Sequence, residues 1–148
     1  MHFSPYSILP FVTSIVVLFL GILVFFRSTN TKINKIFLAW CVSLFIWVFN
    51  YTFVYSAETQ KIALYLARIA CSSVMFFSVI FYHFTAVFLD LKKEMRFILP
   101  IYLLTCILIP FKIFTNYFIS DTHNYFFGFY GKAGPLYIYL VLFFLVCM

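Results

Sequence analysis

Four long runs of apolar residues are the feature that most constrains the fold of this chain. They cover residues 8–26, 36–55, 62–91 and 97–118, and each is bounded by charged or turn-forming residues. A helix needs about 20 mostly apolar residues to cross the hydrocarbon core of a bilayer, which is roughly 30 Å thick. We therefore predict four membrane-spanning helices and an all-α, polytopic membrane bundle as the fold class.

The composition argues against a soluble globular domain. Hydrophobic residues make up 66% of the 148 residues and charged residues only 9%, whereas soluble domains carry about 25% charged residues. A compact domain of this length buries only about 70% of its unfolded surface, so much of the apolar surface has to face lipid. The lipid bilayer is therefore the expected partner of the chain.

A fifth apolar run, residues 136–148, spans only about 20 Å as a helix. It is too short to cross the hydrocarbon core, and a chain end inside the bilayer would leave polar backbone groups without partners. We expect the natural protein to continue beyond Met148. Residues 1–148 would then form one incomplete membrane domain, truncated in its fifth helix.

The basic residues predict the orientation of the bundle, because short cytoplasmic loops carry an excess of Lys and Arg. The loops after the first and third runs together contain six basic residues. The opposite side has only Lys61 and Lys132 in loops, with Arg68 and Lys112 near helix ends. We expect a multi-pass protein of the inner (plasma) membrane, with the N-terminus outside and the loops after the first and third runs in the cytoplasm. Those two loops contain Arg27, Lys32, Lys35, Lys92, Lys93 and Arg96.

Signatures of catalysis, metal binding and nucleic-acid binding are not found. The sequence has no G-x-S-x-G, no H-E-x-x-H and no block of five basic residues. We expect no catalytic residue, cofactor or metal in this segment, and no nucleic-acid partner. Four single cysteines without a C-x-x-C pair are interpreted as packing residues: Cys41, Cys71, Cys106 and Cys147.

Two ionisable residues in the third run are candidates for sensing, because such groups inside membrane spans usually have a function. Arg68 either extends to the outer interface, which we favour, or points inward and organises a polar site. For His83 we favour a structural role, with the ring bonded to a carbonyl or hydroxyl, over a proton relay or pH sensor. One face of this helix is predicted to point into the bundle: Arg68, Ser72, Met75, Val79 and His83.

The second and fourth runs contain further polar or helix-breaking residues. Trp47 and Asn50 share one helical face, and an interhelical hydrogen bond is the favoured role for Asn50, with sensing as the alternative. Pro100 and Pro110 predict a kink or an early break. Lys112 is expected to extend its ammonium to the outer boundary.

Residues 119–135 are expected to form a structured outer loop rich in turns, because they contain Gly128, Gly131 and Gly134–Pro135. Aromatic residues are dense between Tyr125 and Tyr130. They are interpreted either as an anchor at the headgroup level or as part of a sensing site. Tyr125, Tyr130 and Lys132 are the candidates in this loop.

Four sequence features are similar to those of one known family. A basic loop leads into a helix with a central Trp47, and an aromatic residue precedes Arg68 in the third run. In members of that family an aromatic residue often stands two places before this arginine, whereas here Tyr65 stands three places before Arg68. The segments in order resemble the N-terminal seven-helix membrane sensor region of bacterial histidine kinases. The matching stretches are Ala63-Leu64-Tyr65-Leu66-Ala67-Arg68, Phe81-Tyr82-His83-Phe84 with Phe88-Leu89, and the loop from Phe127 to Tyr137.

The resemblance implies a membrane-embedded sensory input domain of a bacterial two-component signal-transduction protein. A complete member would have seven helices, act as a homodimer and carry a cytoplasmic kinase, cyclase or phosphatase module after Met148. The segment itself would not be an enzyme, and its stimulus is undefined. A transporter or channel subunit is the alternative, and a purely structural membrane subunit is a third. The candidate sensing residues are Arg68, Asn50, His83, Trp47, Tyr125, Tyr130 and Lys132.

Overall fold

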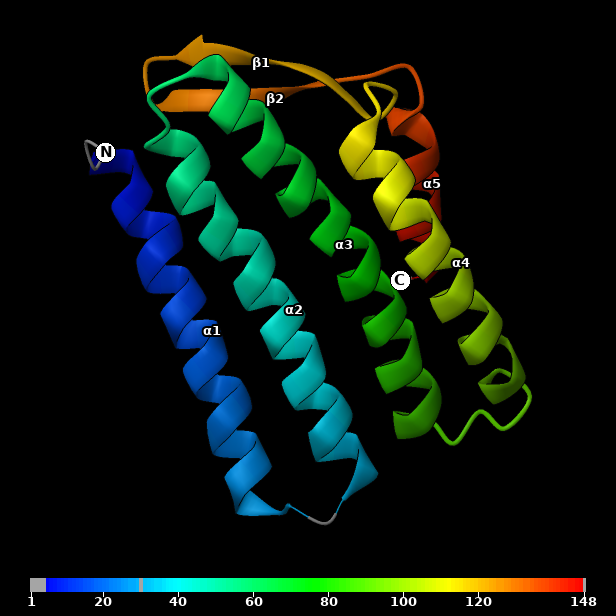
Figure 1. The fold of residues 1–148 in the computed structure, drawn as a ribbon. Coiled ribbons are helices and arrows are strands. Elements are labelled where there is room, and N and C mark those ends of the chain that lie inside the picture. The colour runs from blue at the N-terminus through cyan, green and yellow to red at the C-terminus, as the bar shows by residue number, and fades with distance from the viewer. Residues whose placement is uncertain (1–4, 30, 148) are drawn as a thin grey trace.

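The computed structural model describes residues 5–29 and 31–147, so residues 1–4, Asn30 and Met148 lie outside the description. Within these ranges the chain forms five α-helices, a short 3-10 turn (Pro5–Ser7) and one β-hairpin (Figure 1). The helices are α1 (Ile8–Arg27), α2 (Lys32–Tyr55), α3 (Gln60–Phe88), α4 (Met95–Phe114) and α5 (Tyr137–Cys147). The antiparallel strands are β1 (Ile119–Tyr125) and β2 (Gly128–Ala133).

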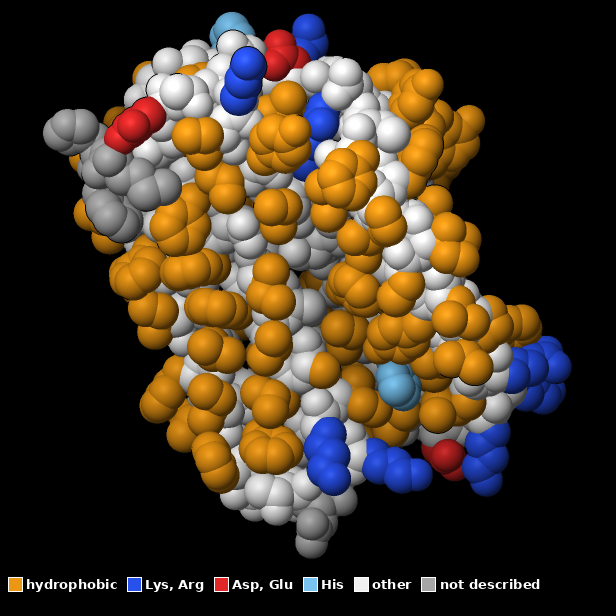
Figure 2. Space-filling model, in the orientation of Figure 1, with side chains coloured by type: hydrophobic (Ala, Val, Ile, Leu, Met, Phe, Trp, Pro, Cys, Tyr) orange, Lys and Arg blue, Asp and Glu red, His pale blue; other side chains and the backbone are white. Residues whose placement is uncertain are grey.

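Helices α1 to α4 are each long enough and apolar enough to cross a membrane, which confirms the helical part of the predicted fold class. Large side chains such as Leu99 and Ile107 are 67% and 71% exposed. Figure 2 shows hydrophobic side chains along the sides of the helices and most of the Lys and Arg side chains near the two ends. This exterior is consistent with a membrane location. The 11 residues of α5 span only about 16 Å.

The hairpin corrects the expectation of an all-α fold. It covers one end of the bundle, which we call the hairpin end (Figure 1). The other end, formed by the connections from α1 to α2 and from α3 to α4, is the basic end. A small two-stranded sheet is marginal alone, so it depends on its packing against α3 and α2.

Two helices end earlier than their apolar runs predict. Helix α3 stops at Phe88 because Asp90 adopts a left-handed φ of 51°. The backbone N–H of Leu91 then bonds back to the Ala86 carbonyl at 2.8 Å, which closes the helix in a Schellman motif. Helix α4 contains both prolines and ends at Phe114, four residues before the expected position.

Helix α3 is the centre of the bundle, because it contacts α2, α4, α5 and both strands. On its inward face Ser72, Met75 and Val79 are buried, as predicted, and His83 is partly buried. Arg68 is buried on the same face. Helix α1 packs against α2 at the edge of the bundle. The side chains at the hairpin end of α3 are therefore enclosed from several directions.

The hairpin is fixed to the adjoining ends of α2 and α3. The Gln60 side-chain amide donates to a carboxylate oxygen of Asp121 at 2.8 Å and to the Thr122 carbonyl at 3.1 Å. The Thr122 hydroxyl donates to the Gln60 carbonyl at 3.3 Å. Gly128 lies against Tyr55, and a Cβ at this position would be 2.5 Å from the Tyr55 carbonyl oxygen.

Replacement of Gly128 by alanine is expected to detach the turn of the hairpin from α2. The φ of 122° at Gly128 is strained for any L-residue, and the obstructing atom belongs to backbone. We expect a loss of about 1–3 kcal/mol in the free energy of unfolding, measured by thermal unfolding in lipid nanodiscs. Gly131→Ala is the matched control, because its Cβ would meet neighbours at 3.4 Å or more. Equal stability of the two variants would contradict the close approach.

Candidate functional site

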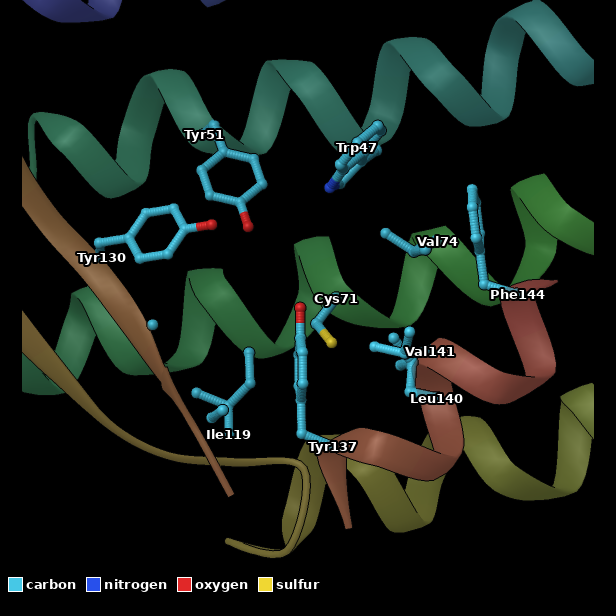
Figure 3. A pocket seen from close by; sticks show the side chains of 12 residues that line it. Trp47, Tyr51, Cys71, Val74, Ile119, Tyr130, Tyr137, Leu140, Val141 and Phe144 are labelled. Atoms are coloured by element: carbon cyan, nitrogen blue, oxygen red, sulfur yellow. The ribbon is translucent and has the colours of Figure 1, made fainter. Parts of the chain in front are cut away.

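A cavity of about 400 Å³ lies under the hairpin, between α2, α3 and α5. Its volume is within the range of small-molecule sites, roughly 300–1,000 Å³. Helix α3 forms the floor, the two strands form the wall toward the hairpin end, and α5 lies opposite α2 (Figure 3). The lining residues are Trp47, Tyr51, Cys71, Val74, Ile119, Tyr130, Gly131, Ala133, Tyr137, Leu140, Val141 and Phe144.

The cavity wall is mostly apolar but carries several hydrogen-bonding groups. Figure 3 shows the hydroxyls of Tyr51 and Tyr130 pointing toward each other, and the Tyr137 hydroxyl pointing toward Cys71 on α3. The rings of Tyr51 and Tyr130 are stacked, with centroids 6.1 Å apart. The Trp47 Nε1 is buried and has no hydrogen-bond partner. An apolar cavity with a few convergent polar groups is the usual form of a ligand site.

Arg68 points into the bundle and is only 6% exposed, so the favoured expectation that it extends to the interface is wrong. Its guanidinium donates to the Ile113 carbonyl at 3.4 Å, to the Ile119 carbonyl at 3.3 Å and to the side-chain oxygen of Asn116. Ile113 is in the last turn of α4, where carbonyls have no helical donor. Arg68 therefore caps α4 and supplies the positive charge favoured at a helix C-terminus.

Lys112 is also buried, at 1% exposure, which contradicts its expected extension to the boundary. Its ammonium donates to the Cys71 carbonyl at 2.8 Å and lies 5.3 Å from the centroid of the Phe118 ring. The ring face attracts the cation. The early end of α4 and the return of the chain through Phe118 enclose this side chain before it reaches the outer boundary.

The two buried cations connect the cavity wall to α4. Lys112 of α4 bonds to the carbonyl of Cys71, and Arg68 of α3 bonds to the carbonyl of Ile119. Cys71 and Ile119 both line the cavity. A shift of either wall residue would therefore change a hydrogen bond to a buried charge, and such bonds are among the stronger ones in proteins.

The remaining candidate residues do not line the cavity. Asn50 donates to the Ile46 carbonyl of its own helix at 2.7 Å, in place of the expected bond to another helix. His83 Nδ1 lies 3.4 Å from the Tyr102 hydroxyl, in line with the favoured structural role. Tyr125 stacks on Phe127 at 5.3 Å, and Lys132 is exposed on β2 opposite Asp121. Of the predicted residues, only Trp47 and Tyr130 line the cavity.

Sequence reasoning missed three polar residues of the cavity: Tyr51, Cys71 and Tyr137. Tyr51 follows Trp47 by one helical turn, so the spacing of four residues was a usable signal. Cys71 follows Arg68 by three residues on the same helix. Tyr137 gave no such signal, because its position depends on how the chain passes from β2 into α5.

Asp121 is the titratable group that secures the base of the hairpin. Hydrogen bonds from the Thr122 backbone N–H and from the Gln60 side chain, each 2.8 Å long, lower the pKa of the Asp121 carboxyl. The charge of Lys132 acts in the same direction. The carboxylate is solvent-exposed, so its contribution is screened and small.

The stability supplied by Asp121 is expected to disappear in acid. Because the folded-state pKa lies below the unfolded value of about 4, the carboxylate stabilises the fold above that pH and loses this effect as the pH falls through the folded-state pKa. We expect Asp121→Asn to melt below the wild type at pH 6 and the difference to close below about pH 4. Thermal unfolding across this range is the measurement. If the difference in melting temperature between the two proteins stayed constant with pH, the carboxylate charge would not be its cause.

No protein-family model, curated protein or solved structure matches the chain. Among residues 5–29 and 31–147, no group of three His, Cys, Asp or Glu side chains could hold a metal ion. The cavity and the two buried cations bonded to its lining residues are therefore the features that bear on function.

Proposed function

We propose that the chain is a membrane-embedded sensory input domain of a signal-transduction protein, with a sensor histidine kinase as the form to test. The cavity is the input site. The observation that carries this proposal is the shared wall: one occupant would contact α2, α3, α5 and the hairpin together. A ligand shifts a conformational equilibrium only through contacts that differ between the two states. A site built from four elements supplies such contacts.

The proposed signal route runs from the cavity to α4 and then to the basic end. Occupancy would displace Cys71 or Ile119, and the bonds of Lys112 and Arg68 would transmit that displacement to α4. Helix shifts of about 1–2 Å are a common form of such transmission. Helix α4 begins at Met95, next to the basic connection from α3.

The distribution of charge supports an orientation with the hairpin end outside. Six Lys and Arg residues lie in the connections at the basic end or in the adjoining helix ends, and an excess of this kind marks the cytoplasmic side. The cavity would then open near the outer leaflet of the plasma membrane. The basic end would face the cytoplasm, where an output module acts.

The orientation is tested by cysteine labelling in intact cells. On a background without the four native cysteines, Asn124→Cys at the exposed hairpin should react with a membrane-impermeant maleimide. Thr29→Cys at the exposed basic end should react only after lysis. The reverse pattern would overturn the orientation. Recovery of both variants in the supernatant after high-speed centrifugation would overturn membrane insertion.

The signalling role is tested on the full gene product. We expect the coding sequence after Met148 to contain further spans, a helical linker and a kinase with a phosphoacceptor histidine. Phosphate transfer from ATP by the full protein in nanodiscs should change when the cavity is filled by Val74→Trp. An inverted repeat of the first spans downstream, with solute flux through proteoliposomes, would favour the transporter instead.

A further inference from the structure

The side chains that line the cavity under the hairpin indicate which class of ligand it would bind. Its polar groups are limited in kind, its aromatic rings come from several elements, and no charged side chain lines it. We propose that it binds an uncharged, planar aromatic molecule bearing a carbonyl oxygen, such as an aromatic ketone or quinone. This inference rests on the proposed function, in which the cavity is the input site.

The requirement for an acceptor comes from Trp47. The indole Nε1–H only donates hydrogen bonds, and here it is buried without a partner. Figure 3 shows this nitrogen directed into the space between α2 and α3. A buried donor left unsatisfied is costly, so a ligand with an acceptor oxygen gains by pairing with it. The Tyr51 hydroxyl from α2 and the Tyr130 hydroxyl from β2 are further donors in the cavity lining.

The requirement for a planar aromatic body comes from the rings around the cavity. Trp47 and Tyr51 are on α2, Tyr130 is on β2, and Tyr137 and Phe144 are on α5. Aromatic rings prefer offset-stacked or edge-to-face contacts with other rings. A flat ligand offers faces and edges to these side chains at once, whereas an alkyl chain uses only their apolar area.

The requirement for neutrality comes from the positions of the two cations. Lys112 bonds to the Cys71 carbonyl, and neither Lys112 nor Arg68 lines the cavity. An ionised ligand would leave water for an apolar space whose lining contains no charged side chain, which is strongly unfavourable. An uncharged aromatic compound also partitions into lipid, and this gives it access to the site from the bilayer.

The test compares 9-fluorenone with fluorene, which has the same three-ring skeleton but a methylene in place of the carbonyl. Binding to the protein in nanodiscs is measured by equilibrium dialysis against protein-free nanodiscs. We expect saturable binding of one molecule per chain, with 9-fluorenone about three- to tenfold tighter, the effect of one net hydrogen bond. Ionised 9-fluorenone-4-carboxylate should bind more weakly than either compound.

Two tryptophan variants show whether the advantage arises in the cavity. Trp47→Phe should remove most of the preference for 9-fluorenone and shift the infrared carbonyl band of the bound ketone to higher wavenumber. Trp40→Phe is the matched control, because its Nε1 is also buried without a partner but the ring stacks on Phe77 outside the lining. That variant should retain the preference. If Trp47→Phe does not fold, Tyr51→Phe with Tyr130→Phe replaces it.

The proposal is overturned if fluorene binds as tightly as 9-fluorenone, if neither compound saturates, or if the carboxylate binds best. It is also overturned if Trp40→Phe and Trp47→Phe reduce the preference equally. These outcomes are independent of the signalling test. Ketone binding without an output module would leave the ligand class standing and remove the sensor function, and phosphate transfer without ketone binding would do the reverse.

Discussion

Replacement of Arg68 by alanine is expected to lower the free energy of unfolding by about 3–5 kcal/mol. The guanidinium is buried and bonds to Ile113, Asn116 and Ile119, which belong to the end of α4 and the start of the hairpin. None of these acceptor oxygens has a helical backbone N–H that could replace the guanidinium as a donor. The cost of leaving these acceptors without a partner adds to the cost of the cavity left by the deleted side chain.

Thermal unfolding in nanodiscs measures this effect, with Arg96→Ala as the matched control. Arg96 is exposed at the start of α4, with its guanidinium carbon 4.7 Å from the centroid of the Phe97 ring. Its removal should change stability by less than about 0.5 kcal/mol. Arg68→Lys should be intermediate, because one ammonium cannot reach three separated acceptors as a planar fork does. Equal losses for Arg68→Ala and Arg96→Ala would show that the buried bonds contribute little.

The sequence predicted the long apolar helices well because hydropathy depends only on neighbours along the chain. The first helix begins at Ile8 as expected and the second ends at Tyr55 as expected. The buried face of α3 also followed from spacing alone. The positions of Arg68 and Lys112 did not, because an upright helix permits either burial or extension. The early end of α4 and the return of the chain over that end bury both side chains in place of letting them extend to the boundary.

The hairpin and the cavity were less accessible to sequence reasoning. Residues 119–125 read as a polar loop, and their pairing depends on contacts that are distant in sequence, such as Gln60 with Asp121. Gly128 and Gly131 were interpreted as turn residues, but both lie in β2, and Phe126 and Phe127 form the turn between the strands. The cavity combines residues from four elements, so spacing along one helix identified Trp47 without its partners.

Substitution of Lys112 is expected to give a second large effect on stability, and two variants separate the contribution of its charge from that of its volume. Lys112→Ala should cost about 2–4 kcal/mol, because truncation of a long side chain that is 1% exposed leaves an unfilled space between α3 and α4. Lys112→Met should remain within about 1 kcal/mol of the wild type, since apolar residues of similar volume often replace buried charges without loss. The Cys71 carbonyl is inside α3 and keeps its helical donor. Thermal unfolding of the two variants is the measurement.

The contrast between Arg68 and Lys112 follows from what each cation bonds to. Arg68 serves acceptors at the end of α4, in the connection that follows and at the first residue of β1, so it is needed for stability. Lys112 serves a carbonyl that is already paired, so its charge adds little to the fold while linking the cavity floor to α4. In the full protein, Lys112→Met should therefore bind 9-fluorenone as the wild type does but change the dependence of output on ligand. A stability loss equal to that of Lys112→Ala would instead make the ammonium a structural group.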